Sequence, residues 1–335
     1  MKAKLLKAAV FATFAVLPAA AQDLTGAGAT FPNPIYSRWF SEYAQQHPGV
    51  HINYQSVGSG AGIRQVSSKI VDFGASDGPM TDQQLAESKT KLLHIPTVLG
   101  AVVPVYNVPG VSGDLKFAPE VIAGIYLGVI TKWNDPNIQH DNPGVKLPDH
   151  SILPVYRSDG SGTTYIFTDF LSKVVPEFQQ RIGKGTSVRF PVGIGQKGNE
   201  GIAGMVRNSQ YSFGYVELVY AEQNHMAFGL VRNAAGKYVK ASTDGVTAAA
   251  ANVKNIPADF RVSITNAPGA TSYPISSFTW LLVPTHFDDP AKGKAMVDFL
   301  HWMLQHGEGE AASMTYASLP APVADRVNQA INEIH

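Results

Sequence analysis

The residues of this sequence that could do chemistry lie in three short loops, each followed by a helix-like run. The richest loop is 157–163, in which Arg157, Ser161 and Thr163 stand together with two glycines. Free N–H groups at the start of a helix bind anions, and glycine lets an anion approach the backbone closely. The hydroxyls can donate hydrogen bonds, and the guanidinium of Arg157 offers a planar fork of donors that suits a tetrahedral oxyanion. The loop therefore indicates an anion site, although a turn that only caps a helix uses the same residue types.

Two other loops have the same chemistry. The loop 25–32 brings a threonine hydroxyl and glycine N–H groups to the start of the first expected helix, and the turn 58–60 opens the second helix with Ser59. In the richest loop, Asp159 is placed to hold the fork of Arg157. Glycine turns before helices are common, so each loop alone is weak support. Three such loops, one of them with an arginine, favour a single site assembled from several helix ends.

Asp77 is the unusual member of this set because it is acidic. It follows the strand-like run 71–75 and precedes a Gly-Pro pair, a position where side chains face a cleft in α/β sheets. A carboxylate repels an anion unless the ligand brings a proton to donate to it. Phosphate carries at least one proton near neutral pH and sulfate carries none, and a site built around such a bond rejects the analogue lacking it by roughly 10⁴–10⁵. Asp77 could therefore select phosphate, or it could simply cap the following turn.

The elements that must position these loops alternate between strand-like and helix-like segments, which is typical of an α/β fold. The apolar, β-branched run 98–106 and the run 278–283 are expected to be strands that cross between two domains. The sequence predicts helices over 34–43, 63–70, 81–87, 119–126, 200–207, 246–253, 290–305 and 322–334, and further strands over 50–54, 71–75, 152–156 and 213–216.

The first 21 residues have the three parts of a secretory signal peptide. Three lysines are followed by an apolar run over 8–17 and then by small residues that end at Ala21. We expect cleavage after Ala21 and, because the chain has no cysteine for a disulfide or a lipid anchor, a protein released into a bacterial periplasm. The remaining length of about 310 residues suits two domains.

The charge balance excludes a broad cationic surface. Cleavage would remove three lysines and leave 23 basic against 26 acidic residues, a net charge of −3. We therefore expect no nucleic-acid partner, and any anion site must be local. The ten histidines show no metal-ligand spacing, and no G-x-S-x-G elbow or adjacent histidine activates Ser161. These observations predict a binding protein without a metal or cofactor, and not an enzyme.

Seven sequence blocks, which follow one another in a fixed order along the chain, make the resemblance to a known family specific. Together they span the chain after its leader, and the whole resembles the periplasmic phosphate-binding proteins of bacterial ABC-type phosphate importers. The blocks are T-G-A-G-A-T-F-P (25–32), V-D-F-G-A-S-D (71–77), L-H-I-P-T-V-L-G (93–100), I-Y-L-G-V-I-T-K-W-N-D (125–135), R-S-D-G-S-G-T (157–163), G-N-E-G-I-A (198–203) and Y-A-S-L-P (316–320).

The resemblance implies a two-lobe periplasmic-binding-protein fold, in which each lobe is a sheet flanked by helices and the lobes close over one dehydrated phosphate. It implies one lobe from 22–103 with 276–335 and a second lobe from 104–275. It also implies that Asp159 does not touch the phosphate but orients Arg157, which does. The implied phosphate ligands are Thr30, Phe31, Ser59, Asp77, Arg157, Ser161, Gly162 and Thr163.

The function implied by the resemblance is capture of phosphate in the periplasm by a monomer. The protein would then deliver it to a membrane permease driven by a cytoplasmic ATPase. Two alternatives remain open: a secreted phosphatase with Ser161 or Thr163 as nucleophile, and a binder of another oxyanion such as sulfate. The chain departs from the family pattern at Gly60-Ala61 and at Tyr156, which bears on affinity. The G-x-G-x-x-G run over 193–198 lacks a nucleotide-binding context, and we expect a surface loop there.

Overall fold

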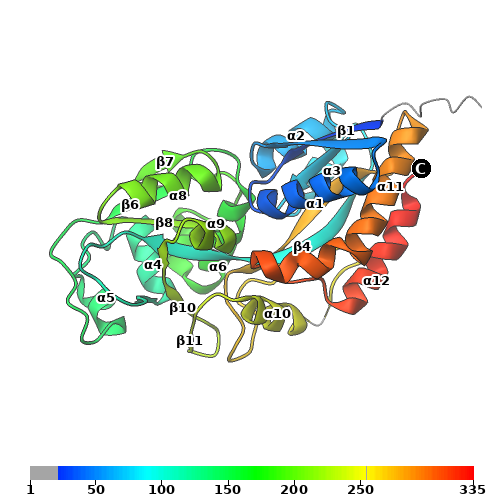
Figure 1. The fold of residues 1–335 in the computed structure, drawn as a ribbon. Helices are drawn as coiled ribbons and strands as arrows, with labels where there is room; N and C mark the ends of the chain where they lie inside the picture. Colours follow the sequence, from blue (N-terminus) through cyan, green and yellow to red (C-terminus); the bar gives the residue numbers. More distant parts are fainter. Residues whose placement is uncertain (1–21, 254) are drawn as a thin grey trace, which may run out of the picture.

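The computed structural model describes residues 22–253 and 255–335, which form an α/β fold of two lobes (Figure 1). The predicted signal peptide lies outside the described residues. One lobe holds the first strands and the last helices, and the other is built from the middle of the chain. The strand β4, Leu92–Tyr106, runs from one lobe into the other. Within the described ranges, no helix has the length and apolar character needed to cross a membrane.

The elements alternate as the sequence predicts. The other strands are β1 Gln22–Gly28, β2 Val50–Ser56, β3 Phe73–Ser76, β5 Lys116–Phe117, β6 Leu153–Arg157, β7 Ile194–Gln196, β8 Ser212–Glu217, β9 Ala227–Phe228, β10 Leu230–Arg232, β11 Tyr238–Val239 and β12 Ser276–Pro284. The helices are α1 Asn33–Gln46, α2 Ser59–Ser67, α3 Asp82–Glu87, α4 Pro119–Tyr126, α5 Pro136–Asp141, α6 Gly162–Val174, α7 Pro176–Arg181, α8 Gly198–Asn208, α9 Leu218–Gln223, α10 Thr243–Ala251, α11 Pro290–Gln305 and α12 Ala321–Ala330, with 3₁₀ helices at Gly307–Met314 and Ile331–Glu333.

One sheet passes through both lobes in the order β2-β1-β3-β12-β4-β8-β6-β7, with β9 beside β4. β4 changes partner along its length: residues 92–101 pair with β12, and residues 102–106 pair with β8. β1 and β3 are parallel, so their carboxyl ends lie at the same edge of the sheet. β6 and β8 are parallel in the other lobe. The long strand therefore joins two sheet halves, and loops at their carboxyl ends meet between the lobes.

The loop before α1 stands on an aromatic core. The aromatic residues of α1 recur at i and i+4, so that one face of the helix is buried, and Phe40 packs 5.2 Å from the ring of Phe299 on α11. Pro34 lies in the first turn, where its missing N–H is not needed. This packing fixes the start of α1 and with it the loop 29–32.

Two sequence predictions are wrong in this lobe. The segment 25–28 belongs to strand β1 and not to a turn, because its glycines allow close packing: a Cβ on Gly26 would lie 2.1 Å from the ring of Phe73. The second helix ends at Ser67, and Ile70, which we placed on its apolar stripe, is 69% exposed. Lys69 has a left-handed φ of 57°, which explains why the helix cannot continue to Ile70.

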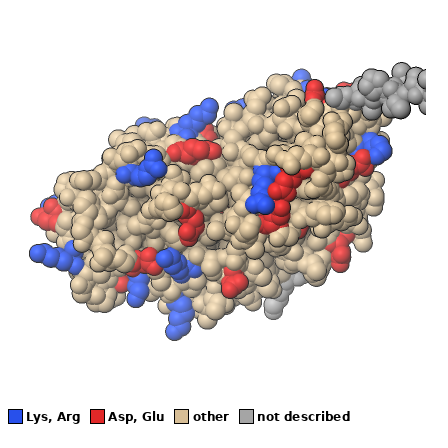
Figure 2. All heavy atoms as spheres, in the orientation of Figure 1, with Lys and Arg blue, Asp and Glu red and all other residues tan. Residues whose placement is uncertain are grey.

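The surface charges are mixed. Figure 2 shows lysine and arginine interspersed with aspartate and glutamate over the visible face. Opposite charges form ion pairs, such as that of Arg38 with Glu42. No single-sign field covers this face, which agrees with the small net charge of the chain.

Candidate functional site

The predicted site residues come together where the two lobes meet. Thr30 and Phe31 follow β1, Asp77 follows β3, and Arg157 is the last residue of β6. Each of the eight residues named as phosphate ligands from the sequence is buried: Thr30, Phe31, Ser59, Asp77, Arg157, Ser161, Gly162 and Thr163.

Arg157 and Asp159 form a bidentate ion pair. Nε of Arg157 donates to Oδ1 of Asp159 over 2.8 Å, and Nη2 donates to Oδ2 over 2.6 Å. Burial alone would raise the pKa of Asp159, but the hydrogen bonds and the charge of Arg157 lower it below its usual value. Oδ1 also accepts the backbone N–H of Gly198 over 3.1 Å. Asp159 therefore holds the guanidinium in one orientation.

Gly58 allows the lobes to approach at this ion pair. Its φ is +93°, in the region that favours glycine, and a Cβ there would lie 2.4 Å from Oδ2 of Asp159. Next to it, the N–H of Gly60 donates to the carbonyl of Gly160 over 2.9 Å, a backbone bond between the lobes. The departure from the family pattern at Gly60 thus lies at a lobe contact. The other departure, Tyr156, packs on Phe190.

Asp77 is a buried carboxyl with one oxygen bonded and one oxygen left over. Oδ1 accepts the hydroxyl of Thr279 over 2.8 Å, whereas Oδ2 has no hydrogen-bond partner among the described residues. Burial raises the pKa of Asp77 to about 7, although Thr279, the charge of Arg157 and Ser59 act in the opposite direction. A Cβ on Gly162 would lie 2.4 Å from this Oδ2, so only a glycine can pack this closely against the free oxygen.

The serines present hydroxyl donors. Oγ of Ser59 accepts the N–H of Gly162 over 3.0 Å and the N–H of Asp77 over 3.3 Å. Oγ of Ser161 caps helix α6 by accepting the N–H of Thr164 over 3.0 Å. Because each hydroxyl oxygen already accepts backbone hydrogens, its own hydrogen is left to donate.

Phe31 is held by contacts on both sides. Its carbonyl accepts the hydroxyl of Tyr316 over 2.6 Å, from the block Y-A-S-L-P near the end of the chain. Its ring packs over Gly100 of β4, where a Cβ would lie 2.6 Å from the ring. These contacts fix the loop that carries Thr30 and Phe31 against the strand shared by the lobes.

Three site residues were missed from the sequence: Asn199, Tyr220 and Thr279. The only sequence signal for Asn199 was its place in the block G-N-E-G-I-A. The run 193–198 just before it was expected to be a surface loop. Residues 194–196 form strand β7 and not a loop, although Ile194 lies at the surface as expected, and Gly198 begins helix α8 at the site. The hydroxyl of Tyr220 donates to the carbonyl of Thr30 over 2.6 Å and so links the lobes directly.

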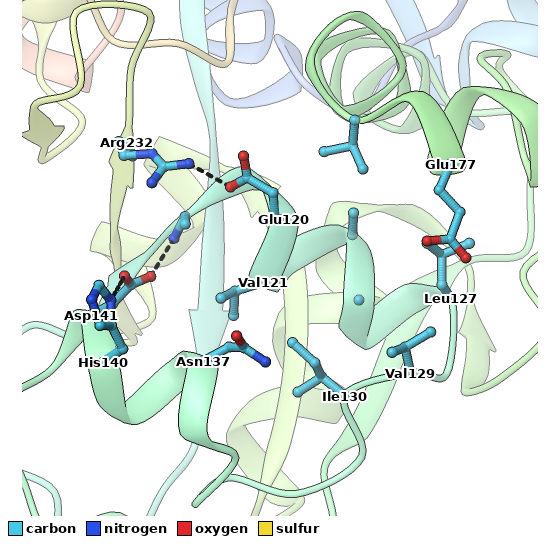
Figure 3. A pocket seen from close by; sticks show the side chains of 14 residues that line it. Glu120, Val121, Leu127, Val129, Ile130, Asn137, His140, Asp141, Glu177 and Arg232 are labelled. Atoms are coloured by element: carbon cyan, nitrogen blue, oxygen red, sulfur yellow. Dashed lines mark hydrogen bonds and ion pairs between the residues drawn. The ribbon is translucent and has the colours of Figure 1, made fainter.

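A separate pocket of about 520 Å³ lies beside α4 and α5 (Figure 3). None of its lining residues is a predicted ligand. Its carboxyl groups have hydrogen-bond partners. Glu120 accepts a hydrogen bond from the guanidinium of Arg232 over 2.6 Å, and Asp141 accepts one from the backbone N–H of Ala118 over 2.9 Å. The donor-rich contact between the lobes is therefore the better candidate for anion binding.

Two lobes that share one sheet, with a buried, donor-lined site where they meet, define the class of two-lobed solute-binding proteins. A family model described as PBP superfamily domain matches residues 15–306. The phosphate-binding protein PstS of Pasteurella multocida is 45% identical over 97% of this chain and 94% of that protein. The PstS of Methanocaldococcus jannaschii is 36% identical over 92% of this chain and 85% of that protein. This chain belongs to the PBP superfamily and, within it, to the family of PstS phosphate-binding proteins.

Solved structures agree on the fold. The periplasmic phosphate-binding protein PfluDING bound with phosphate has a TM-score of 0.74 and 20% identity, over 93% of this chain and 99% of that chain. A putative phosphate ABC transporter substrate-binding protein from Clostridium perfringens has a TM-score of 0.65 and 18% identity, over 89% of this chain and 100% of that chain. The predicted α/β fold of two lobes is confirmed.

Proposed function

We propose that this protein captures inorganic phosphate between its lobes and delivers it to the permease of an ABC-type importer. The names of the PstS relatives support the ligand. The observation that carries the proposal is Oδ2 of Asp77, a buried oxygen without a partner among the described residues, set beside Gly162 and the hydroxyl of Ser59. Such an oxygen suits an anion that brings its own proton, and it disfavours sulfate.

In this proposal each lobe supplies half of the residues that bind the ligand, and Asp159 orients Arg157 through their ion pair. The backbone and side chains of Thr30, Phe31, Ser59 and Asp77 act from one lobe, and those of Arg157, Ser161, Gly162 and Thr163 act from the other.

We place the lobe boundaries at 22–103 with 276–335 and at 104–275. The change of partner along β4 between Ala101 and Val102, and the start of β12 at Ser276, support this division. Binding bonds from both lobes would favour the closed state, so closure is a hinge motion about these strands.

The protein is proposed to act as an exported monomer in the periplasm, after cleavage behind Ala21, with a transmembrane permease and its cytoplasmic ATPase as partners. It is proposed to have no nucleic-acid partner, metal, cofactor or enzymatic activity. The family assignment supports a binding role, since the named relatives are binding proteins.

Calorimetry on protein stripped of ligand tests the proposal. Phosphate should bind with one site per chain, and sulfate at the same concentration should give no comparable heat. Equal binding of both anions would contradict the role of Asp77. Sustained hydrolysis of a chromogenic phosphate ester that disappears in Ser161→Ala would instead establish the phosphatase alternative.

A further inference from the structure

Asn199 lies at the start of α8, is fully buried and has its side-chain amide fixed in one orientation. Its Oδ1 accepts the backbone N–H of Glu217 over 3.0 Å. A flipped amide would direct its NH₂ group at that N–H donor, so the network assigns Nδ2 to the opposite side. Nδ2 donates to Oγ1 of Thr30 over 2.8 Å and to Oγ1 of Thr163 over 3.1 Å. One amide therefore touches a proposed ligand hydroxyl from each lobe.

Both threonine oxygens have their accepting capacity filled. Oγ1 of Thr30 also accepts the backbone N–H of Asn199 over 3.3 Å, and Oγ1 of Thr163 also accepts Nη1 of Arg157 over 3.4 Å. A hydroxyl has two lone pairs and one hydrogen. Each of these hydroxyls therefore accepts two hydrogen bonds, and only its own hydrogen remains to be donated.

We propose that Asn199 is a positioning residue for phosphate: it fixes the hydroxyls of Thr30 and Thr163 as donors, one from each lobe, so that both are directed at oxygens of the anion. The inference rests on the proposed function, in which these two threonines bind phosphate. Because neither hydroxyl can accept a ligand hydrogen, the proton of the ligand is directed to Asp77. Asn199 thus contributes to affinity and to the orientation of the anion.

Variants of Asn199 separate its contacts. Asn199→Ala removes both donors, so the threonine hydroxyls can turn away from the anion. The anion then loses a threonine donor, and we expect phosphate binding to weaken about ten- to hundredfold, the range for a lost hydrogen bond to a charged group. Asn199→Asp keeps an oxygen for the N–H of Glu217 but turns the threonine hydrogens toward itself, so it should weaken binding further. Asn208→Asp is the matched control, because it adds the same charge at an exposed position of the same helix and should change affinity less than twofold.

A double-mutant cycle distinguishes positioning from a general structural role. In a Thr30→Val, Thr163→Val background the hydroxyls are absent, and Asn199→Ala should then change phosphate affinity less than twofold. An effect as large as in the wild-type background would overturn the proposal. If the two valine substitutions themselves leave phosphate affinity unchanged, the threonines are not ligands and the proposed site fails instead.

Neutron diffraction from a phosphate-bound, deuterated crystal tests the same point without a variant. The deuterium of each threonine hydroxyl should lie between its oxygen and a phosphate oxygen. Deuterium directed from either hydroxyl at the side chain of Asn199 would refute the proposal, even if the variants of Asn199 fail to fold.

Discussion

Substitution of Asp77 by asparagine should erase most of the discrimination between phosphate and sulfate. In the wild-type protein Oδ1 is occupied by Thr279, so Oδ2 is the oxygen that can accept the ligand proton. Phosphate in Asp77→Asn loses a hydrogen bond to a charged group, worth about 1.5–3 kcal/mol. Sulfate gains a comparable amount, because the new NH₂ group can donate to an oxygen that the carboxylate repelled.

The substitution weakens phosphate binding and strengthens sulfate binding, so the two free-energy changes add in the ratio of phosphate affinity to sulfate affinity. Together they amount to about 3–6 kcal/mol, which corresponds to roughly two to four powers of ten in the phosphate-to-sulfate ratio. The ratio should therefore fall by at least about a hundredfold.

Calorimetric titration of ligand-free protein with each anion measures this ratio. Asp82→Asn is the matched control: it removes the same charge five residues away, at a side chain that is 91% exposed, and should leave the ratio unchanged. A ratio in Asp77→Asn within threefold of the wild-type value would refute the reasoning, because it would mean that the carboxylate does not face the ligand.

Three further predictions concern affinity and stability. Arg157→Ala should weaken phosphate binding by a few kcal/mol in calorimetry, because the anion and Asp159 lose a buried charged partner; unchanged affinity would remove Arg157 from the site. Phosphate at a thousandfold excess over its dissociation constant should stabilise the fold by about 4 kcal/mol and raise the melting temperature; no shift would count against binding. Burial raises the pKa of Asp77 from 3.8 to about 7, so the ligand-free fold loses stability as pH rises between these values and regains none above them. Asp77→Asn should therefore stabilise ligand-free protein against urea at pH 8 by up to about 4 kcal/mol and much less at pH 4; an equal effect at both pH values would contradict the buried carboxylate.

Local patterns in the sequence were enough to place most elements. The helices expected over 119–126 and 290–305 have those bounds in the structure, because a proline at the first turn and an apolar stripe mark each one. Strand β1 was hidden because glycine is rare in strands, and its glycines are explained by close neighbours such as the ring of Phe73 at Gly26. A sequence pattern identifies a helix or strand when the residues of that element determine its structure. It fails when a side chain far away in the sequence determines the structure.

The site shows the same division. The loops around Arg157 and Asp77 were found because their residue types are unusual for their positions. Thr279, which bonds Asp77 from 202 residues away, could not be found, since only the pairing of β12 with β3 brings it there. Asn199 was visible as part of a sequence block, but its contact with Thr30 depends on the closure of the lobes.

A crystal structure of the protein with bound phosphate tests the central claim most directly. The account predicts a tetrahedral anion with one oxygen about 2.5–2.7 Å from Oδ2 of Asp77, the separation of a charge-assisted O–H···O⁻ bond, and with its other oxygens facing the donors of both lobes. An anion bound elsewhere, or Asp77 turned away from it, would contradict the account.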